Sequence, residues 1–159
     1  MILQFRRVVT GHDASGRAVV QIDEVPKNLA SSRPGATACV VWTTEGFPVD
    51  NTGKEDAGLR KTGTTLDNGT VFRILELAPG VSPRNHRTDS IDCAVVMSGS
   101  IEMELDDGVT VKLKAGDLLV QRGTIHNWVN HGPEVCTIAF VLISAKPVTA
   151  NDKVLHAEN

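Results

Sequence analysis

The segment SIEMELDDGVTVKLK, residues 100–114, has the pattern of a β-hairpin. Apolar residues occupy alternate positions on both sides of a central Asp107-Gly108 pair. Alternation of this kind places one face of each strand in a core, and Asp-Gly favours a two-residue hairpin turn because both positions take a positive φ. The glutamates of the first strand and the lysines of the second then share the solvent face, where they can pair.

Short strands separated by turns continue on both sides of this hairpin, and few windows show helical periodicity. Evenly spaced strands with glycine-containing turns are typical of an antiparallel barrel or jelly roll, so the fold class is predicted to be all-β. The expected strands are residues 5–10, 17–23, 36–43, 71–77, 92–97, 100–105, 109–114, 117–121, 126–130 and 135–144.

The chain of 159 residues suits one structural domain with one hydrophobic core. Residues 71–145 are predicted to form the barrel core, residues 1–70 to supply N-terminal strands and an arm packed on it, and residues 146–159 to form a flexible polar tail. Within the N-terminal part, residues 45–68 are rich in Gly, Thr and Asp. A loop of this length is expected to be a lid over the barrel or an arm that contacts a second subunit.

The composition indicates a globular protein, with 41% apolar and 22% charged residues. A net charge of −3 gives no basic bias that would favour a nucleic acid or an anionic membrane as partner, so a small molecule is the expected partner. The N-terminus lacks the pattern of a signal peptide, and the longest apolar stretch is too short to cross a membrane. We therefore expect a cytoplasmic protein, in which Cys39, Cys93 and Cys136 are buried free thiols.

Three polar residues, His86, Asp92 and His126, stand at or near predicted strand starts beside glycine turns, where a rolled sheet can bring them together. Asp92 shares its strand face with Ala94 and Val96, so its carboxylate is expected to need a partner. Two histidines and one carboxylate can ligate a first-row divalent metal. The alternatives are a metal-free pocket that uses the same groups as acid, base or hydrogen-bond donors, and a purely structural polar cluster.

The spacing of these residues resembles the two motifs of the cupin family. The resemblance implies an antiparallel double-stranded β-helix, or jelly-roll barrel, and a homodimer. The first motif is matched by Gly80, His86-Arg87-Thr88, Asp92 and Gly99, and the second by Gly116-Asp117, Gly123, His126 and Asn130.

The same resemblance carries three metal ligands over to His86, Asp92 and His126, for Fe, Mn, Zn or Ni. Thr88 stands where the family has a second histidine, and Asp92 replaces a longer glutamate. Gln121 stands where the second motif has proline. Thr88 leaves this site without the fourth ligand of the family's metal site.

Four further residues are predicted to line a substrate pocket: Arg73, Thr88, Gln121 and Trp128. Trp128 shares the strand face of His126, which makes it an aromatic wall of the pocket or a core residue. Arg73 lies on the same side of its strand as Leu75 and Leu77. It would clamp a substrate carboxylate if that side faces the barrel interior, and would otherwise be a surface residue.

These features predict an enzyme that acts on a small organic acid, enone or phenolic compound through His86, Asp92 and His126 as catalytic residues. Lyase, isomerase, dehydratase and oxygenase reactions all suit such a site, with a slight preference for the first three because the fourth ligand is missing. The alternative is a non-catalytic protein that binds or senses a small ligand.

Overall fold

The computed structural model describes residues 3–159. Antiparallel strands and their turns make up nearly all of it, as the sequence predicted. Their bounds are β1 Arg7–His12, β2 Ala18–Glu24, β3 Leu29–Arg33, β4 Ala36–Glu45, β5 Gly69–Leu77, β6 Ser90–Ser98, β7 Ser100–Glu104, β8 Thr110–Lys114, β9 Leu118–Arg122, β10 Asn127–Val129, β11 Cys136–Ser144, β12 Val148–Ala150 and β13 Lys153–Leu155, with single 3₁₀ turns η1 Ala57–Leu59 and η2 Asp106–Gly108.

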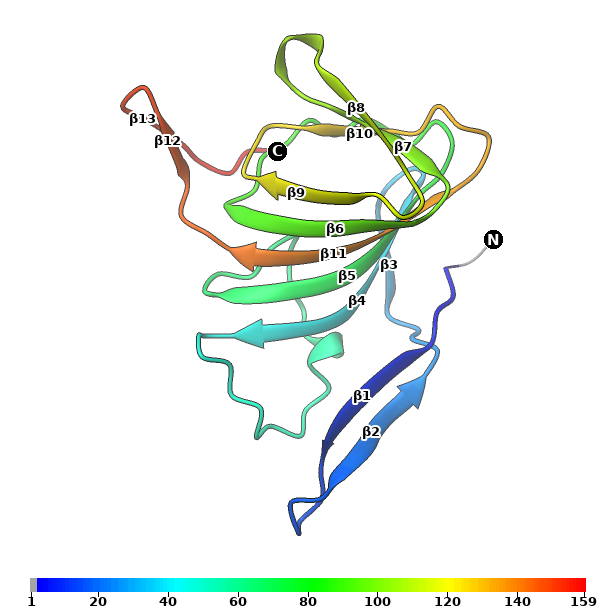
Figure 1. Cartoon of the computed structure of the whole chain (residues 1–159), viewed down its shortest axis with the longest axis vertical. Helices are drawn as coiled ribbons and strands as arrows, with labels where there is room; N and C mark the ends of the chain where they lie inside the picture. The colour runs from blue at the N-terminus through cyan, green and yellow to red at the C-terminus, as the bar shows by residue number, and fades with distance from the viewer. Residues whose placement is uncertain (1–2) are drawn as a thin grey trace.

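Two sheets form the body of the protein (Figure 1). The larger has the strand order β3-β4-β5-β11-β6-β9, and the smaller has the order β10-β7-β8. Since β11 lies between β5 and β6, strands distant in the sequence are neighbours in space. This crossing of connections gives the jelly-roll barrel that the sequence predicted.

The main core lies between the two sheets and follows the alternation seen in the sequence. Ile101, Met103 and Leu113 point inward from β7 and β8 and pack with Trp128 and Phe140. The turn between β7 and β8 has the expected positive φ at Asp107 (56°) and Gly108 (74°). Glu102 and Lys112 face each other across the hairpin and form an ion pair at 3.5 Å.

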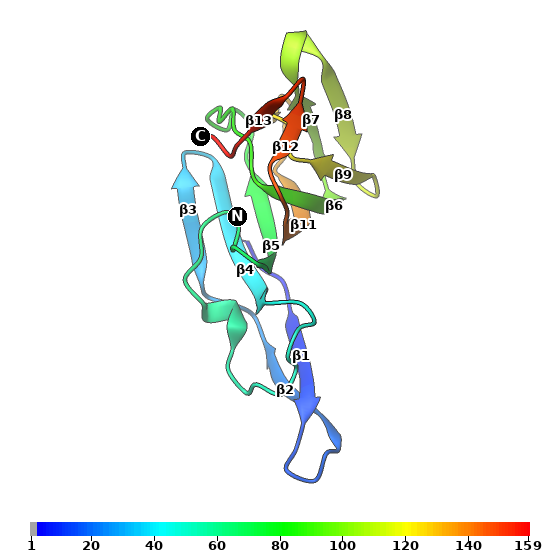
Figure 2. The ribbon, with the colours of Figure 1, turned by 90° about the vertical axis from the view of Figure 1, so that its left-hand side faces the viewer.

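The N-terminal hairpin of β1 and β2 extends away from both sheets (Figures 1 and 2). Its base is fixed by Arg7, which is only 2% exposed and pairs with Asp56 and Glu24, both at 2.6 Å. Strands β3 and β4 instead join the sheet that contains β5. The larger sheet therefore begins well before residue 71, and residues 31–33, which lie outside the predicted strands, belong to β3.

The C-terminal segment pairs with itself and with the barrel. Strands β12 and β13 form a small hairpin, and the chain then returns to the barrel. There the backbone N–H and C=O of Arg87 pair with those of Glu158, and Arg87 Nη1 lies 3.1 Å from a carboxylate oxygen of Glu158. The sequence did not predict these pairings, and the flexibility of the tail stays a prediction.

The three cysteines are free, as predicted, but they differ in exposure. Cys39 and Cys136 are buried, whereas Cys93 is exposed. The prediction of burial was wrong for Cys93 because it lies on the face of β6 opposite Asp92, outside the barrel. Within residues 3–159 no helix has the length and hydrophobicity needed to cross a membrane.

Candidate functional site

His86 and His126 lie side by side at one end of the barrel. They form an isolated antiparallel bridge, in which the backbone N–H of each donates to the carbonyl of the other at 2.9 Å. Their ring centroids are 4.3 Å apart. His126 immediately precedes β10 and His86 lies in the loop before β6, so the bridge joins residues that are distant in the sequence.

The hydrogen bonds of both rings define which nitrogen carries the proton. His86 Nδ1 lies 3.0 Å from the Arg84 carbonyl, and His126 Nδ1 lies 3.0 Å from the Thr124 carbonyl. A carbonyl only accepts, so each neutral ring is protonated at Nδ1 and has a free lone pair at Nε2. Burial, and then the neighbouring His126, lowers the pKa of His86 to about 4. Burial also lowers the pKa of His126, so both rings are neutral near pH 7.

Asp92 lies on the inner face of β6 and is buried. Its carboxylate accepts a hydrogen bond of 2.5 Å from the Ser90 hydroxyl, and the Ser90 oxygen lies 2.9 Å from the Thr88 hydroxyl. Burial raises the pKa of Asp92, while the Ser90 hydrogen bond and the charge of Arg73 oppose that rise. The sequence-based expectation that this carboxylate would need a partner is met by Ser90.

A cavity of about 430 Å³ brings the three predicted site residues to one interior surface. His86, His126 and Asp92 line it together with Trp128 and Phe140. The Trp128 ring meets His126 and Phe140 edge-on, each at 5.8 Å between ring centroids. Trp128 is thus both a wall of the cavity and a member of the core, the two alternatives that its position left open.

Three arginines also line this cavity. Arg73 faces the interior from the middle of β5, between Val40 of β4 and Phe140 of β11. Burial lowers the pKa of Arg73 to about 10, an effect that the charge of Asp92 partly offsets, and the guanidinium stays charged at neutral pH. The other two, Arg33 and Arg84, were not predicted. Arg84 precedes His86 by two residues, and this spacing in an extended segment was a usable signal.

Thr88 and Gln121 were expected to line the substrate pocket, but they lie outside its lining. Thr88 is buried beside Ser90. Gln121 is opposite Asp92 in the β6–β9 register, and its amide donates to the carbonyl and hydroxyl oxygens of Thr124. Neither residue is among those that line this cavity, and a role for Thr88 and Gln121 in a substrate pocket stays a prediction.

The geometry of the donors does not fit the three-ligand metal site that the sequence suggested. Among residues 3–159, no three His, Cys, Asp or Glu side chains come together as a group able to hold a metal ion. His86 and His126 provide two imidazole nitrogens, but Asp92 does not join them within one such group. A divalent metal therefore stays a prediction from the resemblance, and no chemical step below passes through it.

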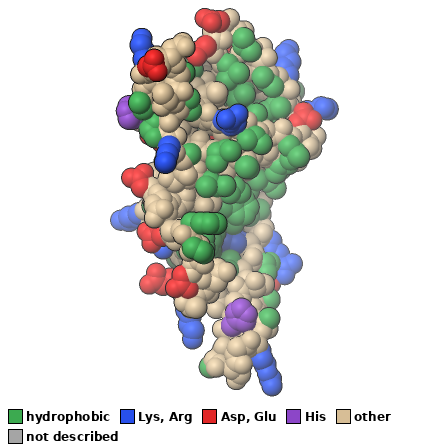
Figure 3. All heavy atoms as spheres, turned by 60° about the vertical axis from the view of Figure 1, so that its left-hand side comes forward, with side chains coloured by type: hydrophobic (Ala, Val, Ile, Leu, Met, Phe, Trp, Pro, Cys, Tyr) green, Lys and Arg blue, Asp and Glu red, His purple; other side chains and the backbone are tan. Residues whose placement is uncertain are grey.

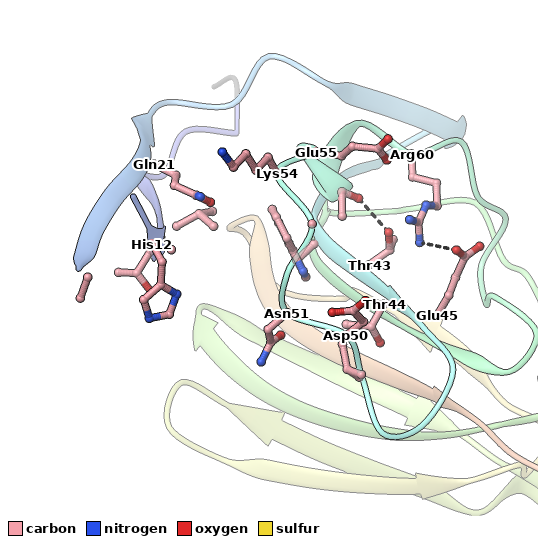
Figure 4. A pocket seen from close by; sticks show the side chains of 18 residues that line it. His12, Gln21, Thr43, Thr44, Glu45, Asp50, Asn51, Lys54, Glu55 and Arg60 are labelled. Carbon is pink, nitrogen blue, oxygen red and sulfur yellow. Dashed lines mark hydrogen bonds and ion pairs between the residues drawn. The ribbon is translucent and has the colours of Figure 1, made fainter. Parts of the chain in front are cut away.

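A second, larger cleft of about 610 Å³ separates the β1–β2 hairpin from β4 and the loop that follows it (Figure 4). Three of its polar residues already have partners: Arg60 lies 3.5 Å from Glu45, and Thr43 donates to the Ala57 carbonyl. His12 lies on the hairpin side of this cleft (Figure 4), and neither of the paired histidines is among its lining residues. The smaller cavity of about 430 Å³ is the candidate active site, because His86, His126 and Asp92 line it.

Comparison with known proteins gives consistent matches. The family model of the cupin domain matches residues 73–143. The chain is 36% identical to "Phomopsin biosynthesis cluster protein C'" of Diaporthe leptostromiformis, over 94% of this chain and 83% of that protein. It is 33% identical to the "Cupin-domain-containing oxidoreductase fogC" of Aspergillus ruber, over 92% of this chain and 76% of that protein.

Two solved structures resemble the fold. The polyketide cyclase RemF from Streptomyces resistomycificus aligns with a TM-score of 0.51 and 15% identity, over 100% of this chain and 85% of that one. The Cnp3 cupin domain from Schizosaccharomyces pombe aligns with a TM-score of 0.51 and 12% identity, over 87% of each chain. At these identities the likeness concerns the fold alone.

Proposed function

The chain belongs to the cupin family, and from that premise we propose that it is an enzyme that transforms a small organic metabolite inside its barrel. The observation that carries the proposal is the pair of neutral histidines, His86 and His126, whose tautomers are fixed at the wall of a cavity. A general base needs a free lone pair at the operating pH, and each Nε2 supplies one.

The chemistry that suits this pair is proton transfer at a carbon next to a carbonyl group. A histidine Nε2 takes the proton from the C–H bond, and the bond's electrons pass to the carbonyl oxygen as an enolate. If a carbon–carbon double bond adjoins the enolate, return of the proton to the far carbon of the conjugated system gives an isomerisation. If the β carbon carries a hydroxyl group, its C–O bond breaks as the enolate electrons form a carbon–carbon double bond, and the hydroxide takes up a proton and leaves as water, which is a dehydration. Asp92, whose pKa burial raises, is placed to hold or return a proton at its carboxyl oxygen.

The test uses benzoylpropionate, an aromatic ketone with acidic methylene protons next to its carbonyl group. Proton NMR in D₂O follows the exchange of these protons for deuterium. The amide of benzoylpropionate is used as a second probe. We expect the wild-type protein to accelerate exchange, and His86→Gln or His126→Gln to slow it by roughly 100-fold, a common contribution of a general base.

His131→Gln is the matched control, because His131 is an exposed histidine in a turn. Exchange that is equally fast in the wild type and in both cavity variants would show that the assigned histidines are not the base. A wild type that binds the probes but leaves their protons in place would favour the alternative of a non-catalytic binding protein.

Redox chemistry is the second candidate, and it is favoured by relatives whose names describe cupin-domain-containing oxidoreductases. Oxidation of an enone or phenolic substrate needs an electron acceptor, and dissolved oxygen is the simplest one. Oxygen consumption that depends on both the protein and the probe, and that is lost in His86→Gln, would support an oxygenase or oxidase over a lyase or isomerase.

The homodimer and the cytoplasmic location are part of the same proposal. Figure 3 shows a face of the molecule on which hydrophobic side chains gather. The outer face of the larger sheet leaves Leu118 77% exposed and Val120 58% exposed, which is unusual for a face without a partner. Free thiols in all three cysteines suit a reducing compartment.

Sedimentation of the purified protein tests the dimer. Leu118→Lys is expected to yield a folded monomer, because the side chain is already outside the core. Val20→Lys, on the projecting hairpin, changes a residue that is 60% exposed and is the matched control. If only Val20→Lys is a monomer, the dimer interface lies on the hairpin instead. If the wild-type protein is a monomer, the dimer is refuted.

A further inference from the structure

Arg73 is a charged residue without a protein partner. Its side chain projects from the middle of β5 into the space between the sheets, where its neighbours Val71 and Leu75 belong to the core. Its Nε is buried and makes no hydrogen bond, and no ion pair within residues 3–159 involves this arginine. Arg73 is only partly exposed, and a charged group withdrawn from water without a partner destabilises a fold, so its place here points to a partner that arrives from outside.

Arg73 has contacts that position it without neutralising it. The guanidinium carbon lies 6.0 Å from the centre of the Phe140 ring, an arrangement that orients a cation weakly. Asp92 lines the same cavity but forms no ion pair with Arg73, and its carboxylate is held by Ser90. The polar edge of the guanidinium is therefore available to a ligand in the cavity.

Arg33 and Arg84 bring two more positive charges to the same space. The Arg33 Nε donates to the Ser82 carbonyl at 2.8 Å. Arg84 donates to the side chains of Thr64 and Asn159. All of these partners are neutral oxygens, which orient a guanidinium but do not compensate its charge. Three arginines and two neutral histidines thus face a single carboxylate, Asp92, and the cavity carries excess positive charge.

The remaining walls define the body of the ligand. Trp128 and Phe140 supply aromatic surface, and Val40 and Leu75 supply aliphatic surface, around the arginines. An inorganic anion would leave these apolar walls without contacts. A ligand with an unsaturated or aromatic body and one anionic end would satisfy both parts of the cavity.

We propose that this cavity binds an organic carboxylate, with Arg73 as the principal anchor for the carboxylate and with Arg33 and Arg84 as supporting cations. The proposal rests on the proposed function in that both place the substrate in this cavity, and it narrows the substrate class to carboxylic acids with a flat apolar body. The planar fork of a guanidinium matches the two oxygens of a carboxylate.

Calorimetric titration with benzoate, cinnamate and benzoylpropionate, each paired with its neutral amide, tests this directly. We expect at least one carboxylate to bind the wild type, and its amide and inorganic phosphate to bind roughly 10- to 100-fold more weakly, the usual contribution of a charge-assisted hydrogen bond. Arg73→Met should weaken carboxylate binding by a similar factor and leave the affinity for the amide unchanged.

Two further variants make the result specific. Arg122→Met removes an exposed arginine on β9 and should leave binding unchanged. Arg73→Lys keeps the charge but loses the planar fork, so it should fall between the wild type and Arg73→Met. Without ligand, Arg73→Met should melt no lower than the wild type, because the arginine it removes has no protein partner.

The proposal is overturned if none of the three carboxylates binds, if amides or phosphate bind as tightly as the carboxylates, or if Arg73→Met and Arg122→Met have the same affinity. These outcomes are distinct from failure of the proposed function. If the carboxylates bind through Arg73 but their methylene protons exchange at a rate independent of His86 and His126, only the catalytic role of the two histidines is refuted. Exchange of the amide without carboxylate binding would refute only the anion site.

Discussion

The backbones of His86 and His126 pair with each other through two hydrogen bonds of 2.9 Å, and their rings lie 4.3 Å apart. The bridge fixes the two side chains at one wall of the cavity, while the carbonyls of Arg84 and Thr124 orient the rings. Two neutral imidazoles are thus presented together, and a proton on either ring would disfavour a proton on the other.

The low pKa of His86 predicts a loss of stability in mild acid. The unfolded chain takes up a proton near pH 6.5, whereas the folded protein resists this until about pH 4. The contribution of His86 is therefore complete above pH 6.5 and decreases as the pH falls toward 4. Urea unfolding should show that the free energy of unfolding decreases between pH 7 and pH 5. This decrease should be about 2 kcal/mol larger in the wild type than in His86→Gln. Parallel pH profiles of the two proteins would contradict a depressed pKa.

Arg7 is predicted to be a major support of the N-terminal hairpin and the loop after β4. It is buried and donates to both carboxylate oxygens of Asp56 and to Glu24. Asp56→Asn should lower the free energy of unfolding by about 3 kcal/mol, because it leaves a buried cation poorly compensated. Asp23→Asn removes the exposed ion pair with Arg6 and should change stability little. Equal effects of the two substitutions on urea unfolding would show that burial of Arg7 is unimportant.

Local patterns in the sequence predicted most of the barrel and the centre of the site. The alternation of apolar and polar residues and the Asp107-Gly108 turn were sufficient to predict β7 and β8. The motif spacing was sufficient to predict that His86 and His126 lie close together. Arg33 was missed because Ser31-Ser32-Arg33 resembles a turn, and only pairing with β4 makes it a strand. The positions of Thr88 and Gln121 depend on hydrogen bonds with Ser90 and Thr124, which a sequence pattern does not show.

Cys93 is predicted to be the reactive thiol. It is exposed on the outer face of β6, whereas burial raises the pKa of Cys136 to about 11 and also raises that of Cys39. Cys93 is opposite Val120 on the face proposed for the dimer, so Ellman's reagent should show one fast reaction per chain in the Leu118→Lys monomer, a slower one in the wild-type dimer, and three in either protein after unfolding. Cys93→Ser should abolish the fast reaction, and a fast reaction that persists in this variant would place another cysteine at the surface.

The metal content of the purified protein is a further prediction, because the geometry of the site and the family resemblance predict different results. Two imidazoles without a third ligand should hold a divalent metal weakly. Elemental analysis after dialysis should therefore find well under one equivalent, and a chelator should leave the melting temperature unchanged. One tightly held equivalent in the wild type, lost in both His86→Gln and Asp92→Asn, would instead support the three-ligand site.

The central claim is that the cavity lined by Arg73, His86 and His126 is where the substrate binds and reacts. A crystal structure of the protein with benzoylpropionate tests it most directly. The account predicts electron density in this cavity, with the carboxylate within hydrogen-bond distance of the Arg73 guanidinium and the ketone beside the paired histidines. Electron density found only in the larger cleft, between the β1–β2 hairpin and the loop after β4, would contradict it. A carboxylate turned away from Arg73 would also contradict it.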